Sequence, residues 1–129
     1  MTDTIAQHMT TCPHSVGAEQ PLDRAIEAMR KFGVRHMPVL HGGELVGMLS
    51  DRDIALLEGI DAHEREGLTV EDVMSPEPYA VTENTPLARV LRGMEQRHIG
   101  SVVVLDADHR ITGIFTSTDA VRMLADRLS

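Results

Sequence analysis

Apolar residues recur along the chain with two different periods, and each period predicts one kind of element. Five apolar residues stand at the spacing of a helix face: Leu22, Ala25, Ile26, Met29 and Phe32. They predict an amphipathic helix that begins at Pro21 and ends at Gly33. Two short apolar runs follow, at 37–40 and 45–49. The Gly-Gly pair between them, within 41–44, predicts a hairpin turn.

The same succession returns about half a chain later, which predicts an internal repeat. Within 9–40, nine residues have an identical counterpart 65 positions later: Met9/Met74, Pro13/Pro78, Val16/Val81, Pro21/Pro86, Leu22/Leu87, Arg24/Arg89, Met29/Met94, Val39/Val104 and Leu40/Leu105. The offset becomes 66 at Gly47 and Gly113, which indicates one inserted residue. We expect it in the second hairpin turn, at 106–110, because turns tolerate insertions.

The repeat predicts the fold class and the division of the chain. Each copy has the order strand, helix, strand, strand, helix, and a unit of about 55 residues buries too little surface to be stable alone. We therefore expect an α/β (α+β) fold in which tandem βαββα repeats pack about a pseudo-twofold axis, with facing sheets and outer helices. The expected parts are an N-terminal arm (1–8), repeat one (9–60), a linker (61–68) and repeat two (69–129).

One phrase of seven residues, 47–53, recurs almost unchanged as 113–119. In each copy a strand-like run ends in a hydroxyl residue, Ser50 or Thr116, and an aspartate, Asp53 or Asp119, follows three residues later. This spacing predicts a helix whose hydroxyl residue is the N-cap and whose aspartate completes a capping box. The spacing therefore has a structural explanation that needs no ligand.

Composition and net charge limit the kinds of partner that the protein could bind. The net charge of −8 and an aromatic content of 2% disfavour nucleic acid as a partner, because neither wide phosphate neutralisation nor base stacking is available. No apolar stretch approaches the length that spans a bilayer, and no signal peptide is recognisable at the N-terminus. We expect a soluble cytoplasmic protein without a membrane partner.

Few residues in the sequence suggest a metal-binding or catalytic role. His8, Cys12 and His14 are close in sequence, but their spacing matches no standard metal-ligand pattern, so we predict no metal site. No nucleophile has a base beside it, and no Gly-rich phosphate loop is present. These observations favour a protein that is not an enzyme.

The sequence resembles a CBS-domain pair, also called a Bateman module. The resemblance rests on Met9-Thr10 and Met74-Ser75-Pro76 at the start of each repeat, on 35–39 before the first hairpin, and on the two Gly-x-x-Ser/Thr-x-x-Asp phrases. It implies a regulatory module that binds AMP, ADP, ATP or S-adenosylmethionine in the cleft between the repeats, with no obligatory cofactor.

The resemblance also implies roles for residues. Asp53 and Asp119 would hold the ribose hydroxyls, and Ser50 and Thr116 would contact ribose or phosphate. The adenine would contact backbone around Val16, Ala80 and Val81. The predicted site is completed by Arg35, His36, Pro38, Arg52 and Thr118.

The two copies differ in charge, which predicts two unequal pockets. Repeat one has Arg35, His36 and Arg52, and repeat two has Gly100, Ser101 and Thr118 at the matching positions. We expect the first set to favour a phosphorylated ligand.

The family commonly forms homodimers by stacking helices. The candidates are the helices at 22–32 and 86–97, or those at 53–57 and 119–128, and the pattern does not choose between them. A protein partner in trans is also implied. The alternative function is a purely structural dimerisation module with no physiological nucleotide.

Overall fold

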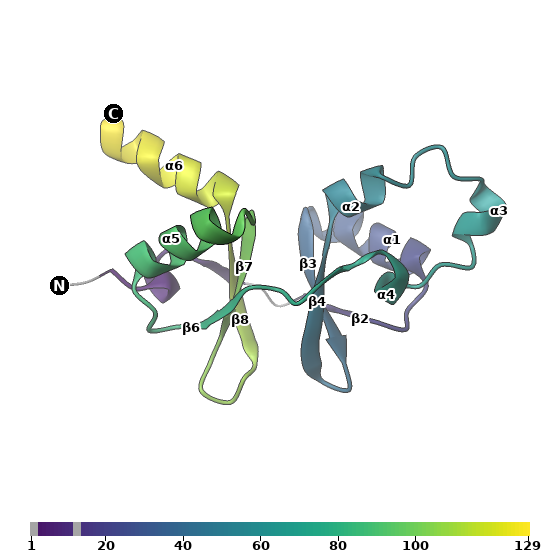
Figure 1. Ribbon diagram of the computed structural model, residues 1–129, viewed down its shortest axis with the longest axis horizontal. Helices are drawn as coiled ribbons and strands as arrows, with labels where there is room; N and C mark the ends of the chain where they lie inside the picture. The colour runs from purple at the N-terminus through teal and green to yellow at the C-terminus, as the bar shows by residue number, and fades with distance from the viewer. Residues whose placement is uncertain (1–2, 12–13) are drawn as a thin grey trace. The chain divides into compact units, whose positions relative to one another are not determined.

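The computed structural model describes residues 3–11 and 14–129, and these form two compact units (Figure 1). We call His14–Pro78 the first-repeat unit, and Met1–Pro13 together with Tyr79–Ser129 the second-repeat unit. The two units therefore do not coincide with the repeats along the chain, because the N-terminal segment belongs to the unit built from repeat two.

The first-repeat unit is a four-stranded sheet with helices. Its strands lie in the order β2-β3-β4-β5 and are β2 (Val16–Gly17), β3 (His36–His41), β4 (Glu44–Ser50) and β5 (Ser75–Pro76). Its helices are α1 (Leu22–Phe32), α2 (Asp51–Ala55), α3 (Ala62–Arg65) and α4 (Val70–Val73). The pair β2–β3 is parallel, and β3–β4 and β4–β5 are antiparallel.

The second-repeat unit has the same topology. Its strands lie in the order β1-β8-β7-β6 and are β1 (Thr10–Thr11), β6 (Ala80–Thr82), β7 (Ser101–Leu105) and β8 (Ile111–Thr116). Its helical elements are the 3-10 helix η1 (Ile5–Gln7), α5 (Leu87–Arg97) and α6 (Ser117–Leu128). The recurrence of both sheet order and pairing confirms the internal repeat.

The short strand that opens each repeat pairs with the sheet of the other repeat. β1 lies antiparallel to β8, and β5 lies antiparallel to β4. The expectation of three strands per repeat is therefore wrong, since each sheet gains a fourth strand from the other copy. Glycine makes this pairing possible: a Cβ on Gly47 would meet the Met74 sulfur, and one on Gly113 would meet the Met9 sulfur.

Helix α1 agrees with its predicted limits. It follows Pro21 and ends at Gly33, whose φ of 66° is left-handed and whose N–H donates to the Arg30 and Met29 carbonyls. The four residues that the pattern places on its apolar face before Phe32 are buried: Leu22, Ala25, Ile26 and Met29. Phe32 departs from this pattern, with 41% of its surface exposed, because it stacks on the His14 ring instead of entering the core.

Described residues of both the predicted arm and the predicted linker form helical turns. Ile5 is fully buried, and its N–H donates to the Thr85 carbonyl at 2.8 Å, so the arm is part of the second-repeat core. The segment predicted as a linker contains the one-turn helix α3, where Arg65 lies 3.5 Å from the Asp23 carboxylate.

Both hairpins occur where the sequence predicts them. Gly42 and Gly43 have φ values of 58° and 84°, the left-handed region that a two-residue hairpin loop requires. The longer second turn contains the inserted residue, and Asp106 Oδ1 accepts hydrogen bonds there from the N–H groups of Asp108 and Arg110. Among the described residues, no helix combines the length and the apolar character needed to cross a membrane.

Candidate ligand-binding site

Ser50 and Asp53 lie where β4 passes into α2. The Ser50 N–H and hydroxyl both donate to Asp53 Oδ2, at 3.0 and 2.9 Å, and the Asp53 N–H donates to Ser50 Oγ at 3.1 Å. This reciprocal pattern is the capping box that the spacing predicts. It fixes the position of the Asp53 carboxylate at the start of a helix.

Thr116 and Asp119 repeat this arrangement where β8 passes into α6. The Thr116 N–H and hydroxyl donate to Asp119 Oδ2 at 2.9 and 3.1 Å, and the Asp119 N–H donates to Thr116 Oγ1 at 3.3 Å. The two phrases therefore present two carboxylates in the same local geometry.

Capping and ligand binding use different oxygens of each aspartate. In both phrases Oδ2 accepts the two capping hydrogen bonds, and no capping bond reaches Oδ1. An ionised carboxylate has about four acceptor positions, so Oδ1 keeps capacity for a further donor such as a sugar hydroxyl. The capping role and the ligand role are therefore compatible in one residue.

The two Oδ1 atoms have different neighbours. Asp53 Oδ1 accepts from the Ser75 hydroxyl at 3.3 Å, and Asp119 Oδ1 accepts from Arg122 Nη1 at 3.3 Å. The repeat counterpart of Arg122 is Leu56, so the second phrase has a cation that the first lacks. Our sequence comparison missed Arg122, although its position three residues after Asp119 on a helix was a usable signal.

The structure brings Arg35 and His36 beside the first phrase. In the β3–β4 pair His36 is opposite Ser50, and the Asp51 N–H donates to the Arg35 carbonyl at 2.9 Å. The second repeat has Ser101 opposite Thr116 in the same register. The start of α2 is thus flanked by basic residues that the start of α6 lacks.

The remaining predicted residues differ in burial. Val16 and Pro38 are buried, whereas Arg52, Ala80 and Thr118 are exposed. Val16 lies in β2 and Val81 in β6, each separated from the strand of its own unit's phrase by one strand. The role of Val16, Ala80 and Val81 towards adenine stays a prediction.

The histidines near the N-terminus have other neighbours. His8 Nε2 lies 3.3 Å from Asp3 Oδ2, and His14 stacks on Phe32 with ring centroids 3.6 Å apart. Cys12 lies outside the described residues. Within the described part of the chain, no three His, Cys, Asp or Glu side chains form a group that could hold a metal ion.

Comparison with known proteins identifies the family. The family model for the CBS domain matches residues 5–58 and 70–126, which together make up most of the chain. The chain belongs to the CBS domain family. Both matched segments contain one of the Gly-x-x-Ser/Thr-x-x-Asp phrases.

Curated relatives include CBS proteins of similar and of greater length. The CBS domain-containing protein YhcV of Bacillus subtilis is 31% identical over 124 residues, covering 95% of this chain and 87% of YhcV. The carnitine transport ATP-binding protein OpuCA of Listeria monocytogenes is 28% identical over 124 residues, but this chain spans only 30% of its length.

Solved CBS domain structures share the fold. The CBS domain pair of protein MJ0100, in complex with 5′-methylthioadenosine and S-adenosyl-L-methionine, has a TM-score of 0.84 at 23% identity, covering 98% of this chain and 99% of that one. CBSX2 in complex with AMP has a TM-score of 0.77 at 28% identity, covering 98% of both chains. The mixed α/β fold is therefore that of a CBS domain pair.

Proposed function

We propose that this chain is a non-catalytic regulatory module that binds adenosine-containing ligands through Asp53 and Asp119. The observation that carries the proposal is the Oδ1 atom of each aspartate, which takes no part in capping and can accept the hydroxyl groups of a ribose. The cap holds the carboxylate in place before the ligand arrives, which lowers the entropy lost on binding. The AMP complex of CBSX2 and the MJ0100 complex support an adenosine-containing ligand.

The two phrases should prefer different ligands. Arg52 belongs to the first phrase, and Arg35 and His36 lie beside it. The positive charge of the two arginines favours AMP, ADP or ATP over a neutral nucleoside. At the second phrase Arg122 donates to Asp119 Oδ1, so it competes with a ribose hydroxyl for this atom. Arg122 is 67% exposed, and exposed ion pairs contribute only about 0.2–1 kcal/mol, so this competition is modest.

Calorimetry with AMP and with adenosine tests the proposal. We expect saturable binding, with AMP tighter than adenosine at one class of site. Arg122→Leu, which introduces the residue of the first repeat, should raise adenosine affinity at the other class by up to about fivefold, since it removes a competitor for Oδ1. Arg110→Leu removes the same charge from the second hairpin and should change neither affinity.

Two results would contradict this account. Equal affinity of AMP and adenosine at every site would remove the proposed difference between the phrases. No measurable heat with either compound or with S-adenosylmethionine would favour a purely structural dimerisation module.

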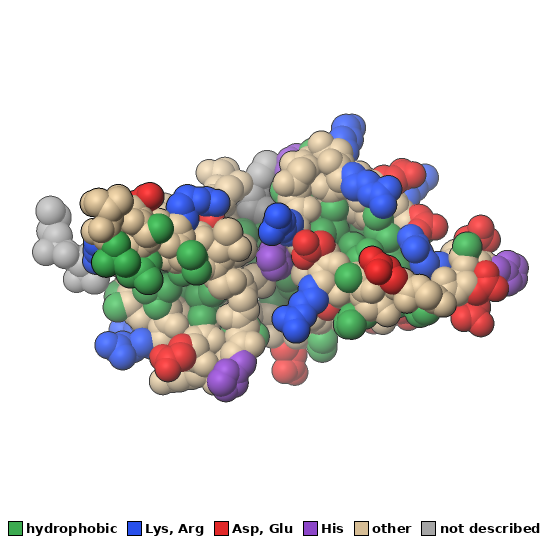
Figure 2. Space-filling model, turned by 90° about the horizontal axis from the view of Figure 1, so that it is seen from above, with side chains coloured by type: hydrophobic (Ala, Val, Ile, Leu, Met, Phe, Trp, Pro, Cys, Tyr) green, Lys and Arg blue, Asp and Glu red, His purple; other side chains and the backbone are tan. Residues whose placement is uncertain are grey.

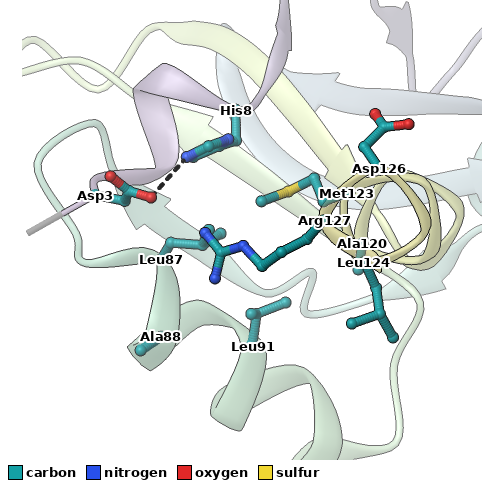
Figure 3. A pocket seen from close by; sticks show the side chains of 10 residues that line it. All are labelled: Asp3, His8, Leu87, Ala88, Leu91, Ala120, Met123, Leu124, Asp126 and Arg127. Atoms are coloured by element: carbon teal, nitrogen blue, oxygen red, sulfur yellow. Dashed lines mark hydrogen bonds and ion pairs between the residues drawn. The ribbon is translucent and has the colours of Figure 1, made fainter. Parts of the chain in front are cut away.

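The module is proposed to signal as a homodimer. A groove of about 750 Å³ lies along α5 and α6, with Leu87, Leu91, Met123 and Leu124 on its walls (Figure 3). Figure 2 shows exposed hydrophobic side chains on the surface of the molecule. On α6, Leu124 and Leu128 are 59% and 76% exposed. Asp126 and Arg127 add both charge signs to this surface, which suits an isologous contact with a second copy.

The Leu124→Glu variant should convert a dimer to a monomer. A carboxylate in an apolar contact loses its hydration when the contact forms, so association becomes unfavourable. Light scattering coupled to size-exclusion chromatography measures the mass directly. Leu56→Glu on α2 tests the other helices, because Leu56 is 78% exposed. If only Leu56→Glu dissociates the protein, the α5–α6 groove is not the interface.

The protein partner that would respond to the dimer is proposed to act in trans.

A further inference from the structure

A second hollow, of about 590 Å³, lies along α5 and contains no residue of either phrase. Seven residues line it: Tyr79, Pro86, Arg89, Arg92, Gly93, Gln96 and Arg97. Three of the seven are arginines, in a chain whose net charge is −8. The hollow thus concentrates positive charge on an acidic protein.

The helical spacing of α5 explains why these residues share one side. Arg89, Arg92, Gly93, Gln96 and Arg97 stand at i, i+3, i+4, i+7 and i+8. The core side of the same helix is formed by other residues, since Leu87, Val90 and Met94 are buried. Packing of α5 on its sheet therefore turns the arginine side outward.

Tyr79 lines the hollow from outside α5. A Cβ on Gly93 would meet the Tyr79 hydroxyl, so the absence of a side chain at Gly93 lets the ring lie against α5. The Arg97 guanidinium lies over this ring, 4.3 Å from its centroid. Stacking of this kind orients the guanidinium and leaves its N–H groups at the ring edge available to an acceptor.

No carboxylate of the described residues pairs with the arginines of the hollow. Among the described residues, Arg89, Arg92 and Arg97 form no ion pair, whereas Arg65 and Arg122 each have an aspartate partner. Like charges held on one helix side repel one another, and a bound anion would relieve that repulsion.

The first repeat shows that the fold does not require this basic surface. Its counterparts of Tyr79 and Arg97 are His14 and Phe32, which stack with an interplanar angle of 9°. Its counterpart of Arg92 is Glu27. The stacked pair is thus kept in both repeats as a structural element, and the basic surface is particular to the second.

We propose that this hollow is a binding site for a small phosphate-bearing anion, separate from the adenosine sites. Its volume is in the range of about 300–1,000 Å³ that small-molecule sites occupy. Guanidinium groups match phosphate oxygens in geometry and charge. A small anion fits better than a nucleic acid, because the chain's net charge of −8 disfavours an extended polyanion.

Tyrosine fluorescence provides a reporter inside the site. Tyr79 is the only tyrosine and the chain has no tryptophan, so its emission comes from the wall of the hollow. Pyrophosphate, which does not absorb where tyrosine does, is the probe, and it is titrated into the full chain. We expect a saturable change in emission. Arg92→Glu should weaken pyrophosphate binding at least tenfold, by losing one charge-assisted hydrogen bond and adding repulsion.

Matched variants separate this site from general charge effects. Arg24→Glu makes the same charge change on α1, at the repeat counterpart of Arg89, and should leave pyrophosphate affinity within about twofold of wild type. Arg97→Phe keeps a stacked partner for Tyr79 but removes the cation, so it should also weaken binding. Urea unfolding midpoints equal to wild type show that the variants are folded.

Three outcomes overturn the proposal. The first is an emission change that does not saturate with pyrophosphate. The second is an equal loss of pyrophosphate affinity in Arg92→Glu and Arg24→Glu. The third is wild-type pyrophosphate affinity in both single variants, Arg97→Phe and Arg92→Glu. Adenosine carries no phosphate, so Arg92→Glu should bind it as wild type does. Failure of the pyrophosphate site and failure of the adenosine sites are therefore distinguishable.

Discussion

Alanine at Asp53 should lower the affinity for AMP about 10- to 100-fold at one site, and alanine at Asp119 should do the same at the other. Each substitution removes an acceptor of charge-assisted hydrogen bonds from the ribose hydroxyls, which contribute about 1.5–3 kcal/mol each. In calorimetry, each single variant should lose one class of AMP site. The double variant should show no AMP binding.

A capping box elsewhere in the chain supplies the control. At the start of α4 the Thr69 N–H and hydroxyl donate to Asp72 Oδ2 at 2.9 and 3.1 Å, as Ser50 does to Asp53. Asp72→Ala loses the same kind of cap, which costs about 1 kcal/mol of stability, and should bind AMP normally. Unchanged AMP binding in the Asp53→Ala/Asp119→Ala protein would leave both aspartates with the capping role alone.

Alanine at Gly47 should reduce the free energy of unfolding by about 1–3 kcal/mol. Gly47 is buried, and the added Cβ would meet the Met74 sulfur and lie 3.0 Å from the Ser75 carbonyl oxygen. Since the backbone of β5 cannot move away without losing its pairing with β4, the clash weakens the strand exchanged between the repeats. Urea unfolding monitored by circular dichroism measures the loss.

Two further variants test the cause. Gly67→Ala places its Cβ 3.8 Å from the nearest heavy atom, the Glu64 carbonyl oxygen, and should change stability by less than about 0.5 kcal/mol. Combined with Met74→Ala, Gly47→Ala should cost much less than the sum of the two single changes, because the shortened side chain leaves room for the methyl group. Additivity within about 0.5 kcal/mol would show that the sulfur contact is not the reason.

Local patterns in the sequence were sufficient for most elements. Helix α1, both hairpins and both capping boxes lie where periodicity, glycines and the Ser/Thr-x-x-Asp spacing predict them. These features depend on contacts within a few residues, so a single stretch of sequence contains the information. The 3-10 helix η1 and the helix α3 were missed, because they are too short to show a period.

The candidate site was predictable in part for the same reason. The phrases and their flanking residues Arg35 and His36 follow from the repeat, and strand pairing places them together. The contact of Arg122 with Asp119 lies outside the repeated phrase, and the repeat gives no signal for it because its counterpart in the first copy is Leu56. The arginine hollow could not be predicted from the sequence, because Tyr79 is part of it. Tyr79 precedes α5 by eight residues, and only tertiary packing places its ring at Gly93.

The sequence by itself determined that the chain is a tandem repeat and where each helix carries its cap and its carboxylate. Tertiary structure alone decided which sheet receives each opening strand. Strands β1 and β5 are two residues long and have no period of their own, so their partners depend on distant contacts. In those contacts the Met9 side chain packs on Gly113 and the Met74 side chain packs on Gly47, so each contact joins residues of different repeats.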